Sequence, residues 1–264
     1  MRCRVGVLAF SFSAILLAQS PVPSGFEAWP VPIEKRVFAG SFSRSPGERA
    51  IKLAGCRNEF LSAQLAVRNS KESELSYQVE PLRGPEAAAI PAEEIRVRFG
   101  AYLPVDETGQ YTADPLLESK SIRLPANLAQ PVWLTIHVPK GIAAGKYAGS
   151  LRLAAGGESL DVPLEVEVFS ATLPDPPDYS YYLNLWQDPN GVARAHKVDL
   201  WSEAHWQLLA RYAENLAMHG EKSIMTSIIH DPWNAQTGYI FPTMVEWKHP
   251  GEWKQGEAPK FAWD

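Results

Sequence analysis

Apolar and polar residues alternate along most of the first two thirds of the chain. Every second position is apolar or small in five runs: residues 61–67, 95–101, 132–138, 147–153 and 160–168. Such alternation places one set of side chains on each face of a β-strand. Turns rich in glycine or proline separate the runs, at residues 83–85, 141–145 and 156–157. Short strands divided by such turns predict an antiparallel β-sandwich over residues 26–172.

Beyond residue 172 the spacing of apolar residues changes. Three prolines within residues 173–178 predict a stiff linker that ends the last strand. A helix is expected over residues 202–218, with Ser202 as its N-cap and Gly220 just past its end. Its apolar face, at helical spacing, consists of Trp206, Leu209, Ala213 and Leu216.

Two short apolar runs, residues 181–186 and 224–229, flank this helix and are interpreted as strands. The second has no polar alternation, which is typical of a strand buried on both sides. We expect the two to pair in parallel through a right-handed crossover. A (β/α)₈ barrel needs eight strands, so residues 179–264 are interpreted as the N-terminal, incomplete part of such a barrel. The predicted fold is therefore mostly β, an antiparallel β-sandwich followed by a partial (β/α)₈ barrel.

The first 18 residues have the features of an export signal. Arg2 and Arg4 precede an apolar stretch at residues 5–17, and Ala18 offers a small residue at a cleavage point. The alternative is an uncleaved anchor, but the stretch is short for a span that needs about 20 apolar residues. We therefore expect a signal peptide at residues 1–18, a tether at residues 19–25, and a secreted or periplasmic protein without a membrane partner after cleavage.

Cysteine content and charge limit the classes of function. Cleavage removes Cys3 and leaves Cys56 alone, so the mature chain cannot form an internal disulfide. It also removes two arginines and no acid, so the net charge changes from −5 to 23 minus 30, or −7, which disfavours nucleic acid as a partner. No phosphate-binding loop, nucleophile elbow or zinc-binding helix motif occurs, and His205 and His219 are too far apart to share a metal. We expect no cofactor and no metal.

Tryptophan is concentrated in the second part of the chain. Of nine tryptophans, seven lie at or after Trp186. Flat apolar rings suit the C–H-rich faces of pyranose sugars. The alternative is that these large aromatic side chains simply pack in the core.

Several short motifs, in their order and spacing, carry a family resemblance. The first part contains Arg57-Asn58-Glu59, Asp114-Pro115-Leu116-Leu117 and Gly145-Lys146-Tyr147-Ala148-Gly149. The second contains Trp186-Gln187-Asp188-Pro189, Leu200-Trp201-Ser202 and His230-Asp231-Pro232-Trp233. With these motifs the chain resembles exported bacterial proteins related to glycoside hydrolase family 123, in which a β-sandwich precedes a (β/α)₈ barrel.

The resemblance implies an exo-acting β-N-acetylgalactosaminidase or hexosaminidase. In that family the 2-acetamido oxygen of the substrate attacks its own anomeric carbon, and an adjacent Asp-Glu pair on a later barrel strand assists. The usual scheme uses an enzyme carboxylate as nucleophile instead. The only Asp-Glu of this chain, Asp106-Glu107, falls in the sandwich and is better interpreted as a solvated acidic turn. The chain is therefore expected to lack catalytic residues and to be inactive alone.

Two rival functions stay open at this point. One is a non-catalytic carbohydrate-binding or structural β-sandwich protein, and the other is a reaction run with a partner chain that supplies the remaining barrel. Asn58-Glu59 precedes a strand, and a charge-capped turn is its favoured interpretation.

Candidate substrate-binding residues follow the two predicted barrel strands, because barrel sites form at the C-terminal strand ends. They are Trp186, Gln187, Asp188, His230, Asp231 and Trp233. The tryptophans are candidates for stacking on a sugar or for packing at the rim, and the polar residues for binding hydroxyls or backbone. The expected partner is a glycan containing N-acetylhexosamine. An open strand edge beside an apolar helix face also predicts self-association.

Overall fold

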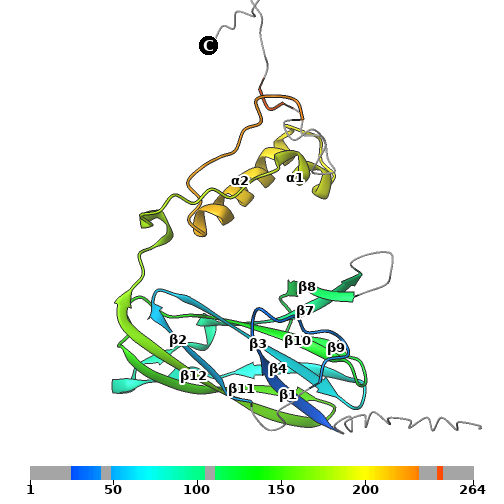
Figure 1. Ribbon diagram of the computed structural model, residues 1–264, viewed down its shortest axis with the longest axis vertical. Coiled ribbons are helices and arrows are strands. Elements are labelled where there is room, and N and C mark those ends of the chain that lie inside the picture. Colours follow the sequence, from blue (N-terminus) through cyan, green and yellow to red (C-terminus); the bar gives the residue numbers. More distant parts are fainter. Residues whose placement is uncertain (1–24, 43–48, 105–110, 232–242, 246–264) are drawn as a thin grey trace, which may run out of the picture. The chain divides into compact units, whose positions relative to one another are not determined.

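The computed structural model describes residues 25–42, 49–104, 111–231 and 243–245 (Figure 1). It divides the chain into two compact units, Met1–Leu173 (unit 1) and Pro174–Asp264 (unit 2). The predicted signal peptide lies outside the described residues. No helix in the described ranges combines the length and the apolar character that a membrane crossing requires.

Unit 1 is a β-sandwich of two sheets, which confirms the predicted sandwich. One sheet has the strand order β1-β3-β10-β7-β8, and the other β2-β12-β11-β4-β9, with the short strands β5 and β6 beside β11. The bounds are β1 Phe26–Val31, β2 Ile51–Arg57, β3 Phe60–Asn69, β4 Ser73–Val79, β5 Leu82–Arg83, β6 Ala89–Ile90, β7 Ile95–Pro104, β8 Tyr111–Leu117, β9 Ser121–Leu124, β10 Ala129–His137, β11 Gly145–Ala155 and β12 Glu158–Thr172. Two 3-10 helices, η1 Pro85–Ala87 and η2 Ala92–Glu94, lie between strands.

One strand pair departs from the antiparallel pattern. Strand β12 pairs with β2 in parallel, with Leu164 opposite Ile51, whereas β12 and β11 form an antiparallel hairpin. Parallel neighbours need a long connection, and here nine further strands separate β2 from β12 in the chain. The hydrophobic period reports which face of a strand is buried but not the direction of its neighbour, so this pair could not be predicted.

The sandwich core follows the alternation seen in the sequence. Inward positions of β10 are completely buried at Val132, Leu134 and Ile136, whereas the intervening Trp133 and Thr135 are only half-buried. On β12, Val162, Leu164 and Val166 are buried, and the residues between them are exposed. These residues form one continuous apolar cluster with the inward side chains of the opposite sheet. Burial of a side chain of this size stabilises the fold by about 1.5–3 kcal/mol before entropy is counted.

A half-buried tyrosine holds the segment after β1 against the outer face of the sandwich. The hydroxyl of Tyr102 on β7 donates to the carbonyl oxygen of Ala129 at 2.8 Å, and that of Val37 lies 3.3 Å away. Burial raises the pKa of Tyr102 from 10.0 to about 12, because the phenolate would lose its hydration. The neutral phenol is therefore the form that the fold stabilises.

We expect this contribution to stability to disappear at high pH. The folded-state pKa is raised, so the stabilisation is complete below pH 10 and is lost as the pH rises from about 10 to 12. Urea unfolding at pH 9 and at pH 11 measures this loss. The matched variant Tyr102→Phe should lose about 1 kcal/mol at pH 9, from the bond to Ala129, and should show a smaller further decline. An equal decline in both proteins contradicts this role of Tyr102.

Unit 2 contains two α-helices, α1 Pro189–His196 and α2 Glu203–Met218, after the 3-10 helix η3 Pro176–Asp178. Helix α2 confirms the predicted helix, since Ser202 Oγ accepts from the N–H of His205 at 3.3 Å as an N-cap. Gly220 follows the helix with φ +91°, a conformation that favours glycine. Helix α1 was not predicted. The sequence marks its start with a proline in the first turn. At its end the backbone of Lys197 is left-handed.

The two strands predicted in unit 2 are not formed, and this prediction was wrong. Residues 181–186 and 224–229 contain no strand, and one isolated parallel bridge joins Leu183 to Glu221. Ile224 is 79% exposed rather than buried on both sides. A buried parallel strand needs a neighbour on each edge and a layer on each face, and the described residues of unit 2 provide neither for residues 224–229.

Candidate functional site

A cavity of about 480 Å³ in unit 2, lined mostly by aromatic and apolar side chains, is the best candidate for a functional site. We call it the tryptophan cavity. Its lining residues come from the two helices and the segments that flank them: Trp186, Gln187, Asp188, Pro189, Val192, Trp201, Trp206, Leu209, Ala210, Tyr212, Ala213, Leu216, Ile224 and Met244. A mainly apolar pocket with few polar groups is typical of sites for small molecules.

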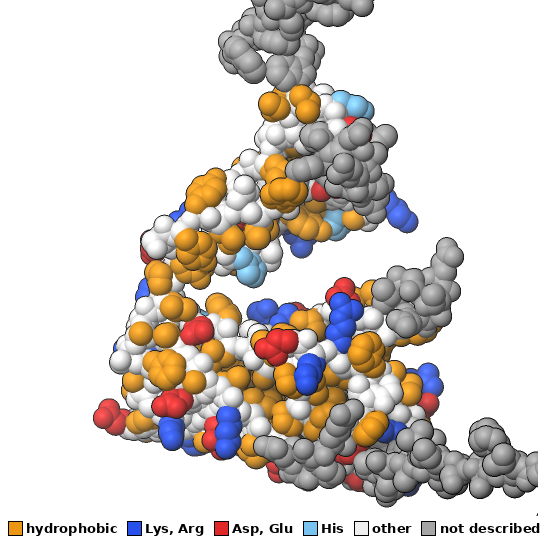
Figure 2. Space-filling view, in the orientation of Figure 1, with side chains coloured by type: hydrophobic (Ala, Val, Ile, Leu, Met, Phe, Trp, Pro, Cys, Tyr) orange, Lys and Arg blue, Asp and Glu red, His pale blue; other side chains and the backbone are white. Residues whose placement is uncertain are grey.

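Exposed apolar side chains surround this cavity. Figure 2 shows hydrophobic side chains gathered over unit 2. Trp186 is 70% exposed and Trp206 is 53% exposed, so both rings present large apolar surfaces to solvent. An exposed apolar patch of this kind usually marks a binding or association surface.

A buried histidine holds Trp201 in position. His205 is completely buried at the start of α2, and its Nδ1 accepts from the N–H of Trp201 at 2.9 Å. Since Nδ1 is an acceptor, Nε2 carries the proton and donates to the carbonyl oxygen of Pro189 at 2.9 Å. The neutral imidazole thus joins the first turn of α1 to α2. Above it the rings of Trp201 and Trp206 lie 5.6 Å apart between centroids.

Asp188 is the only acidic residue among the described residues that line the cavity. Its Oδ2 accepts from the guanidinium of Arg194 at 3.1 Å, six residues further along the chain on α1. Its Oδ1 is buried and has no hydrogen-bond partner among the described residues. A β-carbon at Gly191 would lie 2.4 Å from Oδ2, so glycine is needed there for the carboxylate to adopt this position. The carboxylate is therefore fixed in place with one acceptor unused.

Gln187, also predicted as a substrate-binding residue, makes its visible bonds to the backbone. Its Nε2 donates to the carbonyl oxygen of Ser223 at 2.9 Å, and its Oε1 accepts from the N–H of Met225 at 3.2 Å. Glu221 plays a similar part, because its carboxylate accepts from the N–H groups of Leu185 and Ser223. The hydroxyl of Ser223 and these N–H groups hold the pKa of Glu221 below its usual value. The side chains of Gln187 and Glu221 thus bind the backbone groups that two paired parallel strands would bind in each other.

The structure brings three of the six predicted site residues together and leaves the others apart. Trp186, Gln187 and Asp188 line the tryptophan cavity, whereas His230 and Asp231 are not among its lining residues. Trp233 lies outside the described residues. Trp201 and Tyr212 line the cavity but were not candidates. Trp201 belongs to the family motif Leu200-Trp201-Ser202, which was a signal for it. Tyr212 lies within α2, away from any predicted strand end.

The Asn58-Glu59 motif forms a turn between β2 and β3, in agreement with its favoured interpretation. Glu59 Oε2 accepts from the N–H of Cys56 at 2.6 Å, and Asn58 has φ 63°, a left-handed conformation that asparagine tolerates. Asn58 Nδ2 donates to the carbonyl oxygen of Leu173 at 3.1 Å. These bonds give the motif a structural role. Asp106 and Glu107 lie outside the described residues.

Two domain families match the chain, one in each unit. The glycoside hydrolase 123 N-terminal domain matches residues 42–155, and the glycoside hydrolase 123 catalytic domain matches residues 186–256. The chain belongs to glycoside hydrolase family 123. The catalytic-domain match begins at Trp186 and contains both α-helices of unit 2. Every described residue that lines the tryptophan cavity lies within this match.

Solved structures agree with this assignment at the level of the fold. A family 123 glycoside hydrolase from Clostridium perfringens, described for glycolipid glycan hydrolysis, superposes with a TM-score of 0.76 at 17% identity. The match covers 90% of this chain and 43% of that enzyme, so the chain spans less than half of the enzyme's length. It also confirms that unit 2 corresponds to the start of the family's catalytic domain.

Other similar structures share far less of the fold. The PapD-like domain 7 of human CEP192 has a TM-score of 0.30 at 14% identity, over 62% of this chain and 99% of that domain. The CooA pilin subunit of enterotoxigenic Escherichia coli has a TM-score of 0.29 at 14% identity, over 47% of this chain and 92% of the pilin. No curated protein matches the chain.

Proposed function

We propose that the tryptophan cavity binds a terminal N-acetylhexosamine of a glycan, as part of the substrate site of a family 123 hydrolase. The observation that carries this proposal is an aromatic cavity inside the stretch that matches the family's catalytic domain. The Clostridium perfringens enzyme is described for hydrolysis of glycolipid glycans, which supports a glycan as the ligand class.

The cavity has the physical properties that a sugar ring requires. The C–H face of a pyranose stacks on an aromatic ring, and Trp201 and Trp206 present such rings beside each other. The volume of about 480 Å³ lies within the range of about 300–1,000 Å³ that small-molecule pockets have. Asp188 supplies a carboxylate to the described lining of the cavity, and carboxylate oxygens accept hydrogen bonds from hydroxyl groups such as those of a sugar.

A binding experiment tests this proposal. We expect methyl N-acetyl-β-galactosaminide to quench the tryptophan fluorescence of the 264-residue chain in a saturable way. Methyl β-galactoside, which lacks the acetamido group, serves as the matched control ligand and should bind more weakly. Absence of saturable quenching with both sugars would refute the proposal.

The chain alone is not expected to cleave the glycosidic bond. Substrate-assisted hydrolysis needs a general acid and a carboxylate that orients the acetamido group, and the described lining of the cavity supplies one carboxylate, Asp188. Acid–base assistance is typically worth about 10²–10⁴-fold in rate. We therefore expect the 264-residue chain to release no nitrophenol from aryl N-acetyl-β-galactosaminide above background. Turnover that disappears in Asp106→Asn or Glu107→Gln would show that the sandwich carries the site instead.

A further inference from the structure

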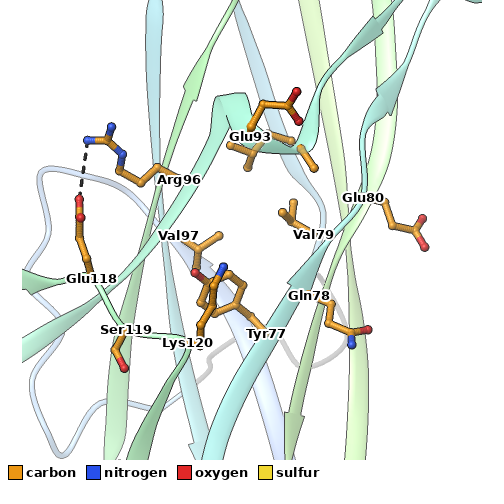
Figure 3. A pocket seen from close by; sticks show the side chains of 12 residues that line it. Tyr77, Gln78, Val79, Glu80, Glu93, Arg96, Val97, Glu118, Ser119 and Lys120 are labelled. Carbon is orange, nitrogen blue, oxygen red and sulfur yellow. Dashed lines mark ion pairs between the residues drawn. The ribbon is translucent and has the colours of Figure 1, made fainter.

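A hollow of about 800 Å³ opens on the side of the β-sandwich, away from any candidate residue discussed so far. We call it the edge hollow. Figure 3 shows that one wall is the end of β4, with Tyr77 and Val79, and the other is the start of β7, with Val97. Residues 118–120, which connect β8 in one sheet to β9 in the other, bound it at one end.

Both walls are strand edges without a partner among the described residues. Strand β9 pairs with β4 only over residues 73–76, so the outer edge of residues 77–79 has no neighbouring strand. Strand β8 pairs with β7 only from Phe99 onward, so the outer edge of residues 95–98 is likewise unpaired. An unpaired edge presents backbone N–H and C=O groups that another extended chain can bind.

The direction of the free groups on β4 follows from one hydrogen bond. The N–H of Glu80 donates to the carbonyl oxygen of Ser150 on β11, at 3.3 Å. Backbone groups alternate in direction along an antiparallel strand, so those of Tyr77 and Val79 point away from β11. The outward N–H and C=O groups of Val79 therefore lie beyond the end of β9 and border the hollow, whereas those of Tyr77 adjoin the last pair of that ladder, Ser76 with Ser121.

The side chains that line the hollow also alternate in character. Val97 is buried and Val79 is half-buried, and both point into the hollow from their own walls (Figure 3). Gln78, Glu80 and Arg96 are exposed. An inserted strand would therefore place every second side chain against valine and the others at the solvent-facing rim.

The charges at the rim favour a basic partner. Arg96 is neutralised by Glu118, with 3.7 Å between Nη1 and Oε1. The ammonium group of Lys120 lies over the ring of Tyr77, 5.3 Å from its centroid. Glu93, which also borders the hollow, has no ion pair with any described residue. Glu80 has none either, although its charge acts on Arg152 of β11. Three of the lining side chains are acidic and two are basic, so the lining carries a formal charge of −1, which favours a basic partner over an acidic one.

From these observations we propose that the edge hollow binds an extended peptide segment by β-strand addition. The segment carries apolar residues at alternate positions, which face Val79 and Val97, and basic residues between them, which face Glu80 and Glu93. Strand addition combines main-chain hydrogen bonds with pockets for alternate side chains. A sugar is disfavoured as the occupant, because Lys120 covers the face of the one aromatic ring in the lining.

The test uses the 264-residue chain and the acetylated, amidated hexapeptide (Lys-Val)₃. Amide chemical shifts measured by NMR should change at Tyr77, Val79 and Val97 on titration. A peptide with the same side chains but N-methylated valines should bind with an affinity at least about tenfold lower, because its valines lack the N–H donors. Equal binding of the two peptides, or shifts that do not include these residues, would overturn the proposal.

Protein variants separate the backbone contribution from the charges. Val79→Pro removes an outward N–H and should weaken binding about tenfold, whereas Val79→Thr keeps it and should bind nearly as well as the native chain.

Glu80→Gln combined with Glu93→Gln should weaken the binding of (Lys-Val)₃ but not that of (Ser-Val)₃. If the same amides shift with protein concentration alone, or with N-acetylgalactosamine, the occupant is a second copy or a sugar and the proposal is wrong. The N-methylated peptide keeps the test decisive if Val79→Pro does not fold.

Discussion

Replacing Tyr147 by alanine is expected to lower the free energy of unfolding of the chain by about 3–5 kcal/mol. Tyr147 lies on β11, is completely buried, and belongs to the main apolar cluster of the sandwich. Its ring packs against Gly84, where an added β-carbon would lie 2.3 Å from Cε1. Its hydroxyl donates to the carbonyl oxygen of Ala143 at 2.7 Å. Truncation would leave both a cavity and an unsatisfied carbonyl group.

Two further variants assign this loss to its causes. Tyr147→Phe keeps the ring and loses only the bond to Ala143, so it should cost about 1 kcal/mol. Gly84→Ala forces the ring to move and should cost about 1–3 kcal/mol. Urea unfolding followed by circular dichroism measures all three. A loss below 1 kcal/mol for Tyr147→Ala would contradict the packing described for this residue.

Replacing Trp206 by alanine is expected to reduce the affinity for N-acetylhexosamine about tenfold or more. Trp206 provides one of the two adjacent rings of the cavity, and loss of an aromatic contact costs about 0.5–1.5 kcal/mol beyond the area that it buries. The side chain is 53% exposed on the surface of α2, so the variant should fold normally. Isothermal titration with methyl N-acetyl-β-galactosaminide measures the change.

Matched variants keep this result specific. Trp206→Phe retains an aromatic face and should recover part of the affinity, whereas Trp133→Phe alters a half-buried tryptophan of the sandwich and should leave sugar binding unchanged. Equal affinity in Trp206→Ala and the native chain would remove the tryptophan cavity from the site.

The sandwich could be predicted from sequence because its strands obey a local rule. Each inward residue of β10 and β12 is recognisable from its immediate neighbours, and the sheets then bury what the pattern marks as apolar. Helix α2 was equally accessible, since Ser202, its apolar face and Gly220 are all encoded within it. Local signals were sufficient for these elements.

The site depends on contacts that no local pattern encodes. His205 was evident in the sequence, but its role follows from bonds to Trp201 and to Pro189, which is 16 residues away. Residues 224–229 have the composition of a buried strand but no ladder partner in the described structure, so composition alone was misleading. Gln187 lines the cavity, but its side-chain amide binds the backbone of Ser223 and Met225.

The family motifs of unit 1 also have structural explanations. Glu59 closes a turn through Cys56, and Tyr147 fills the core beneath Gly84. In unit 2, by contrast, the motifs that begin at Trp186 and Leu200 contribute residues directly to the cavity. The candidate chemistry of the described residues is therefore concentrated in unit 2.

The central claim is that the tryptophan cavity receives the apolar face of an N-acetylhexosamine, and saturation-transfer difference NMR tests it most directly. With methyl N-acetyl-β-galactosaminide and the 264-residue chain, irradiation of the protein should transfer saturation to the ring protons of one sugar face and to the acetamido methyl group. The transfer should be strongly reduced in Trp206→Ala and should be unchanged in Trp133→Phe. No transfer to the native chain, or equal transfer in both variants, would contradict the account.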